Sequence, residues 1–182
     1  MKNLVNLSLS LILFLVAIFS CTSCKKGEDD PLVSLRSRDA RITGDWVLTG
    51  MESVDESESA GGSRRYISSF NGTMVTETSI VNGNSDIYHY PLVMTLSISQ
   101  DGKFTYKIVD DMGTEESQEY WSWTNNTRNK TGINLGAFGT YNILELRNSR
   151  MVLTNESFFR RIGASGSSSR NAAKTTLTFE KR

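Results

Sequence analysis

Residues 92–108 read LVMTLSISQDGKFTYKI, and this stretch decides the fold class. Apolar residues occupy every second position as far as Ile98 and again from Phe104 to Ile108, on either side of the turn pair Asp101-Gly102. Successive side chains of a β-strand point to opposite faces of its sheet. The pattern therefore predicts an antiparallel hairpin with one face toward a core and the other toward solvent.

Alternation of this kind continues on both sides of the hairpin. Trp46 and Leu48 begin it near the start of the domain, while Asn71-Gly72 and Asn82-Gly83 predict further hairpin turns. No stretch after the N-terminal segment repeats apolar residues with the spacing of a helix. We therefore expect an all-β domain, an up-and-down antiparallel meander of about eight strands. Closure into a barrel would remove its exposed strand edges.

Three polar stretches are predicted to connect these strands. The first is acidic, rich in serine and ends in glycine, the second is acidic, and the third is rich in glycine, serine and alanine. They span Ser53–Gly62, Asp110–Glu116 and Ile162–Lys174. We expect the first two to be loops and the third to be mobile.

The N-terminus has the pattern of a cleaved signal peptide. A single lysine precedes an almost wholly apolar run at residues 4–19. A helix of that length spans about 24 Å, which is short of the roughly 30 Å hydrocarbon core of a bilayer. Small residues and a cysteine follow in Thr22-Ser23-Cys24, which resembles the lipobox of bacterial lipoproteins. The resemblance implies a signal peptide at residues 1–23 and a lipid on Cys24, with Cys21 as the alternative.

Charged residues follow the cysteine. Residues 25–31 read KKGEDDP, which resembles the export tether of lipoproteins in the Bacteroidetes group. That resemblance implies a lipid-anchored protein of the bacterial outer membrane, and it is compatible with display of this protein at the cell surface. Residues 24–41 then form the lipidated cysteine, the tether and a short helix, for which Leu32 and Leu35 would share one face.

Composition excludes several classes of function. The chain has 182 residues with 20 Lys plus Arg and 20 Asp plus Glu, so no net field attracts nucleic acid. Both cysteines precede residue 25, which excludes a disulfide framework or a thiolate metal site in the domain. Residues 42–182 are long enough for one domain with its own core.

One short motif extends the interpretation to a family. Gly44-Asp45-Trp46 resembles the Gly-x-Trp signature that opens the first strand of lipocalins. The resemblance implies a lipocalin-like barrel over residues 42–182, in which Trp46 plugs one end and the glycine allows the preceding helix to cross closely. An eight-stranded barrel either holds one small ligand or is filled by its own side chains.

The aromatic side chains are the candidate binding residues. An aromatic residue buries roughly 150–250 Å², so the same residues equally suit a packed core. The candidates for the barrel interior or a ligand site are Trp46, Tyr88, Tyr90, Phe104, Tyr106, Trp121 and Trp123. The resemblance implies a membrane-anchored binding protein for a small apolar or amphipathic ligand. The alternative is a filled barrel that serves as an accessory or interaction subunit of an envelope complex.

Catalytic chemistry has little support in the sequence. His89 is the only histidine, so a site with several histidine ligands is excluded. The carboxylate pairs Asp110-Asp111 and Glu115-Glu116 lack the patterned oxygen array of a calcium loop. We predict no enzyme activity, no catalytic or metal-binding residue, no cofactor and no nucleic-acid partner.

Overall fold

The computed structural model describes residues 36–124, 130–162 and 168–182, with side chains described outside residues 161–168. The expected signal peptide, Cys24, the tether and the pair Leu32 and Leu35 lie outside the described residues. The elements are α2 (Arg38–Ile42), β1 (Gly44–Ser59), β2 (Gly62–Phe70), β3 (Met74–Val81), β4 (Asn84–Ile98), β5 (Lys103–Asp110), β6 (Gly113–Trp123), β7 (Gly132–Leu135), the 3-10 turn η2 (Gly136–Phe138), β8 (Thr140–Leu146), β9 (Arg150–Ile162) and β10 (Ser168–Lys181).

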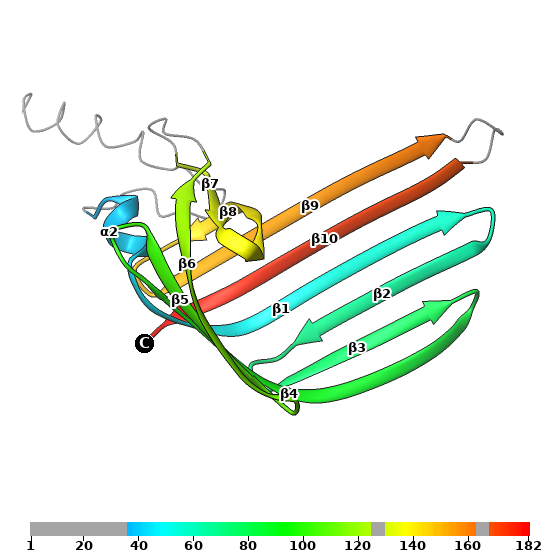
Figure 1. Ribbon diagram of the computed structural model, residues 1–182, viewed down its shortest axis with the longest axis horizontal. Coiled ribbons are helices and arrows are strands. Elements are labelled where there is room, and N and C mark those ends of the chain that lie inside the picture. Colours follow the sequence, from blue (N-terminus) through cyan, green and yellow to red (C-terminus); the bar gives the residue numbers. More distant parts are fainter. Residues whose placement is uncertain (1–35, 125–129, 163–167) are drawn as a thin grey trace, which may run out of the picture.

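The strands form one antiparallel up-and-down sheet that closes into a ring (Figure 1). Each strand pairs with the next along the chain, and β10 returns to pair with β1. The all-β, antiparallel and meandering prediction is confirmed, whereas the expected number of about eight strands was wrong, because the ring has ten. An additional pairing of residues 44–47 of β1 with residues 95–98 of β4 bypasses β2 and β3 at one end of the ring.

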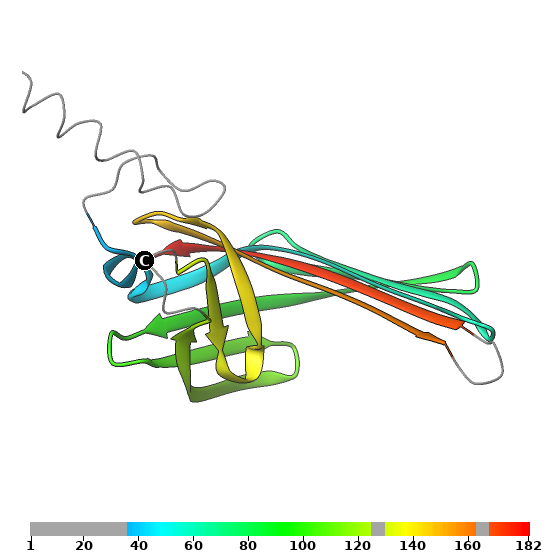
Figure 2. The same ribbon diagram turned by 90° about the horizontal axis from the view of Figure 1, so that it is seen from above.

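The ring has two parts with different surroundings. Around the β1–β4 contact, strands curl about a hydrophobic core, and we call this part the closed end. Beyond it, six neighbouring strands continue as a single layer, shown edge-on in Figure 2. We call this layer the extension sheet; it comprises residues 53–59 of β1, 62–68 of β2, 77–81 of β3, 84–88 of β4, 155–160 of β9 and 169–175 of β10. Seven residues of β1 at about 3.3 Å each give it a length of roughly 23 Å.

The short helix α2 and Trp46 cover the closed end. Ser37 caps the helix, since its hydroxyl accepts a hydrogen bond from the Ala40 amide at 3.1 Å. The Trp46 indole is fully buried, and its Nε1 donates to the carbonyl oxygen of Ile42 at 2.7 Å. This bond satisfies one of the carbonyl groups that a helix leaves unpaired at its C-terminal end. The first strand and the helix before it are therefore held together by one aromatic side chain.

The described residues of all three predicted connections lie mostly in strands instead. Residues 53–59 continue β1, and β2 begins at Gly62, so only a tight turn separates them. In the acidic stretch at 110–116, only residues 111–112 form a turn, because β5 ends at Asp110 and β6 begins at Gly113. In the third stretch, residues 163–167 lie outside the described part, while residues 168–174 belong to β10 rather than to a loop. All of these strand segments except 110–116 lie in the extension sheet, where polar residues face solvent on both sides.

The turn predicted at Asn82-Gly83 is confirmed. β3 ends at Val81 and β4 begins at Asn84, which leaves two residues between them. Asn82 has φ 51° and Gly83 has φ 88°. Positive φ at both central residues is the signature of the type I′ turn, whose twist matches that of paired strands.

Candidate interaction surface

Four of the seven candidate aromatic residues lie buried in the closed end. Trp46 and Phe104 are 0% and 1% exposed, and Tyr106 and Trp121 are 8% and 9% exposed. Trp123 is half-buried against this core, and its Nε1 donates to Asp39 at 2.8 Å. These side chains come from β1, β5 and β6, which alternate toward the core as their sequences predict.

Aromatic rings contact one another across the closed end. Tyr106 meets Phe138 edge-to-face with ring centroids 4.7 Å apart, and Phe104 lies 6.2 Å from Phe138. Trp121 and Trp123 make a second edge-to-face pair at 5.4 Å. Both arrangements are favoured by the charge distribution of aromatic rings. Phe138 was missed in the sequence because it lies in the short 3-10 turn η2 and not within a strand, so no two-residue alternation marks it.

Tyr90 lies where the closed end passes into the extension sheet. It is half-buried, and its hydroxyl donates to a carboxylate oxygen of Glu77 at 2.7 Å. Burial, and then the negative charge of Glu77, raise the pKa of Tyr90 to about 12. Tyr88, two residues earlier on β4, is 60% exposed on the extension sheet and does not enter the closed end. Sequence alternation alone had placed the two tyrosines together, since they share one face of β4.

No described side chain of the extension sheet is buried. Large apolar residues stand in solvent there, with Phe158 at 63% exposed and Phe159 at 58%. Ile87 is 59% exposed and Tyr66 is 47% exposed. An ordinary antiparallel sheet keeps one face against a core, and a sheet without such a core is poorly stabilised. Within the described chain, both faces of this layer are therefore open to solvent.

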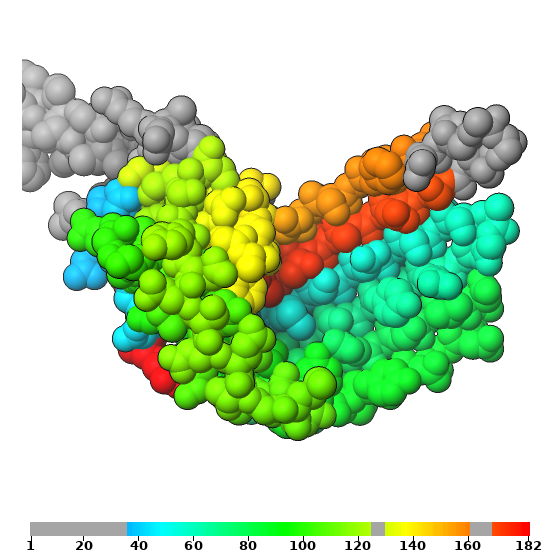
Figure 3. All heavy atoms as spheres, viewed as in Figure 1, coloured from blue at the N-terminus to red at the C-terminus, as the bar shows by residue number. Residues whose placement is uncertain are grey.

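The strand register assigns each residue to a face. Directly paired residues of neighbouring antiparallel strands lie on the same face. The face continuous with the interior of the closed end, which we call the inner face, is mainly polar and includes the row Ser157, Ala173, Asp55, Tyr66, Ser79 and Asp86. Figure 3 looks onto this face, which forms one side of an open V whose other side is the closed end.

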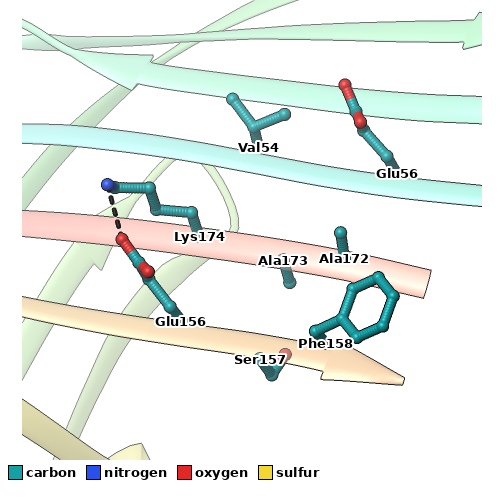
Figure 4. A pocket seen from close by; sticks show the side chains of 8 residues that line it. All are labelled: Val54, Glu56, Glu156, Ser157, Phe158, Ala172, Ala173 and Lys174. Atoms are coloured by element: carbon teal, nitrogen blue, oxygen red, sulfur yellow. Dashed lines mark ion pairs between the residues drawn. The ribbon is translucent and has the colours of Figure 1, made fainter. Parts of the chain in front are cut away.

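The opposite face, which we call the outer face, is more apolar. Two neighbouring rows on it contain Glu156, Lys174, Val54, Ile67, Thr78 and Ile87, then Phe158, Ala172, Glu56, Arg65, Ile80 and Ser85. Ala172 has a short side chain between larger neighbours, and the surface beside it is hollowed by about 670 Å³ (Figure 4). The hollow is shallow and open to solvent, which suits a protruding side chain of a protein better than an enclosed small molecule.

Charged groups on the outer face are paired across strands. Lys174 donates to Glu156 at 2.5 Å, which raises the pKa of Lys174, and Arg65 Nε lies 3.0 Å from Glu56. The guanidinium of Arg170 lies 5.4 Å from the centre of the Phe158 ring. Such exposed pairs contribute little stability. They do fix the positions of charges beside the apolar side chains.

The extension sheet has two free edges within the described chain. β8 pairs with β9 only as far as Thr154, so residues 155–160 of β9 pair with β10 alone. β5 pairs with β4 only from Leu92 onward, so residues 84–88 of β4 pair with β3 alone. Each edge presents unpaired backbone N–H and C=O groups, which are a ready template for another strand.

No family model, curated protein or solved structure matches this chain. Among the described residues, no helix has the length and apolarity needed to cross a bilayer. Within the same ranges, no three His, Cys, Asp or Glu side chains lie close enough together to hold a metal ion.

His89 is exposed, and its Nδ1 lies 3.0 Å from the Thr76 hydroxyl.

Proposed function

We propose that this chain is a lipid-anchored interaction protein of the bacterial envelope. In this proposal the closed end is a filled, lipocalin-like base, and the extension sheet binds another protein of the envelope. The observation that carries it is that no described side chain of that sheet is fully buried, although the sheet carries large apolar residues. Large apolar side chains that are left exposed on a sheet without its own core are typical of surfaces that bind other proteins.

The interior of the closed end favours this role over ligand binding. A binding pocket for a small molecule usually has a volume of some 300 Å³ or more and lies within an apolar lining. The positions that would line it are taken by rings in mutual contact, since Phe138 packs against both Phe104 and Tyr106. Trp46 and Phe179, both fully buried, close the base. We therefore place the function on the extension sheet, with an apolar ligand in the base as the alternative.

The anchor belongs to the same proposal. A lipid on Cys24 would hold the chain at the outer membrane, and residues 25–36 would separate it from α2. Each buried CH₂ of an acyl chain contributes about 0.8 kcal/mol, so two or three chains anchor a protein firmly. A protein fixed in this way meets its partner within the plane of the membrane, which raises the effective concentration of a weak contact.

Site-specific photo-crosslinking in the intact bacterium tests this function. The photoreactive residue p-benzoylphenylalanine replaces Tyr66 or Tyr88 of the full-length chain, and Tyr120 is the matched control. Tyr120 is 65% exposed but lies on β6 in the closed end. We expect the two extension positions to give one cross-linked envelope protein, identified by mass spectrometry, and the control position to give none.

Two results would contradict the proposal. The first is a cross-linking pattern that is the same at all three positions, since the extension sheet would then have no special role. The second comes from native mass spectrometry of the protein purified from its own bacterium. A stoichiometric small molecule that leaves on unfolding would place the function in the closed end instead.

A further inference from the structure

We propose that the free edge of β9 pairs with the same edge of a second copy of this chain. The two β9 strands run antiparallel about a two-fold axis that passes beside Phe158, so that the two extension sheets form one continuous sheet. This inference rests on the proposed function, because it names one partner of the extension sheet. It concerns the edge of that sheet, which leaves both faces open to other proteins.

The edge has the length and the side chains for strand addition. The Asn155 side chain still donates to the Thr140 carbonyl of β8, and beyond it residues 156–160 have no strand partner on that side within the described chain. Two large apolar residues, Phe158 and Phe159, are each more than half exposed there. Proteins usually protect such an edge with a bulge, a proline or an inward-pointing charge. The described β9–β10 register is continuous along this edge and contains no proline. The edge is therefore open to a seventh strand.

Symmetry limits the register to a few choices. A two-fold axis normal to the sheet keeps each face on its own side, so a residue must pair with one that shares its face. Residues on one face of β9 are all even-numbered or all odd-numbered, so the axis must pass beside a residue and not between two residues. Centring on Phe158 pairs it with itself, and it pairs Glu156 with Arg160 of the second copy, twice. The same centring pairs Ser157 with Phe159 on the inner face.

Charge complementarity selects this register over its neighbour. Centring on Phe159 would pair Phe158 with Arg160 and leave both Glu156 side chains without a cationic partner in the second copy. Opposite charges in direct cross-strand pairs stabilise a sheet, and like charges destabilise it. Glu156 already accepts a bond from Lys174 through one oxygen. Its second oxygen remains able to accept from Arg160 of the other copy.

The other free edge lacks this complementarity. Residues 84–88 of β4 contain one charged side chain, Asp86, and no cation. Centring a symmetric pair on Tyr88 would place Asp86 opposite Tyr90 and Ile87 opposite His89. No pair of opposite charges forms in that arrangement. The geometry therefore assigns self-association to β9 and leaves β4 as an internal control.

Cross-linking of single cysteine variants in bacterial membranes tests the pairing. The full-length chain carries Phe158→Cys, or Ser85→Cys as the matched control, and a short bismaleimide is added. Ser85 lies in the same row and on the same face as Phe158 but at the β4 edge. The unsubstituted chain measures the background from Cys21 and Cys24. We expect a covalent dimer from Phe158→Cys alone; equal yields from the two variants, or none from either, would overturn the pairing.

Charge reversal then tests the register. In the Phe158→Cys background, Glu156→Arg or Arg160→Glu should each lower the dimer yield on the order of tenfold, because two like-charge pairs replace two ion pairs. The double variant should restore the yield, although it leaves Lys174 without its own carboxylate. Failure of the double variant to recover would exclude this register.

The outcomes separate this inference from the function on which it rests. Cross-links from Tyr66 and Tyr88 to a different envelope protein, with no dimer from Phe158→Cys, would leave the function standing and overturn the pairing. A dimer from Phe158→Cys, without cross-links to any other protein, would support the pairing and contradict the binding of a second envelope protein.

Discussion

Lys181 covers the ring of Trp46, with its Nζ 4.9 Å from the ring centroid. The same ammonium donates to the carbonyl oxygens of Arg41 at 3.1 Å and Thr43 at 2.5 Å. One side chain from the last strand therefore binds the end of α2 and the buried tryptophan together. A cation over an aromatic face contributes about 0.5–2 kcal/mol, with the larger values in desolvated positions.

Trp46→Ala should lower the free energy of unfolding by about 3–5 kcal/mol, because it removes a fully buried aromatic side chain from the closed end. The substitution also leaves the Ile42 carbonyl without its indole donor. Urea-induced unfolding measures the loss. Tyr120→Ala, at a position that is 65% exposed, should change the stability by no more than about 0.5 kcal/mol. A loss of that small size at Trp46 would contradict its place in the core.

Gly44→Ala should destabilise the protein by about 2–3 kcal/mol. Gly44 has φ +125°, and a Cβ there would lie 2.5 Å from Cε of Lys181. Gly83→Ala is the matched control, since Gly83 has φ +88° with no atom within 4 Å of its added Cβ. The control should cost about 1–2 kcal/mol from backbone strain alone. Equal losses in the two variants, measured by thermal unfolding, would show that the Lys181 contact adds nothing.

Tyr90→Phe should flatten the loss of stability at high pH. The folded protein holds the Tyr90 proton up to a pKa of about 12, whereas the unfolded chain releases it near the ordinary value of 10.0. Between these values the unfolded state binds fewer protons, so stability falls as pH rises. Urea midpoints at pH 9 and pH 11.5 measure the slope, with Tyr88→Phe as the exposed control. A slope unchanged in Tyr90→Phe would rule out this source. At neutral pH the variant should cost about 1 kcal/mol, the usual value of one hydrogen bond.

Cys24→Ala should abolish incorporation of a radioactive fatty acid and release the protein from membranes, because it removes the thiol to which the lipid would be attached. Cys21→Ala should leave labelling intact. The pair distinguishes the two cysteines of the N-terminal segment. Labelling that survives in Cys24→Ala and disappears in Cys21→Ala would move the anchor to the earlier cysteine.

The fold class could be predicted where alternation and burial coincide. Leu96 and Phe104 are almost fully buried, as the alternating pattern of the hairpin at residues 92–108 predicts. Asn82-Gly83 forms the turn that its backbone preferences favour. In the hairpin of residues 92–108 a single apolar face decides the register, because a slip of one residue would expose it.

The extension sheet could not be predicted from the same signal. Residues 53–59 have no apolar face, since the strand is open to solvent on both sides. Serine and aspartate have low strand propensity, and their local pattern is typical of a loop. Pairing with β2 on one side and β10 on the other overrides that preference. Strand identity here comes from pairing with two neighbours, of which β10 is distant in the sequence.

The sequence predicted which aromatic residues are candidates for the interior, but it did not fully predict where in the fold each of them lies. Trp46, Phe104 and Trp121 lie in the closed end. Tyr88 has the same alternation but falls beyond the point where the core ends, and no local feature marks that point. Phe138 fills the interior from a turn, where a two-residue period gives no information. The candidate interaction surface emerged only when the register of the strands was known.

The pairing of β1 with β10 has a consequence for how the molecule forms. Trp46 pairs with Lys181, so the two strands that join the ring are separated by about 135 residues of intervening chain. Contacts between segments so remote in the chain make folding slow, in the range of milliseconds to seconds for β-rich domains. The β10 side of β1 therefore stays unpaired until the last strand has been synthesised, so the ring closes only after translation of the whole domain.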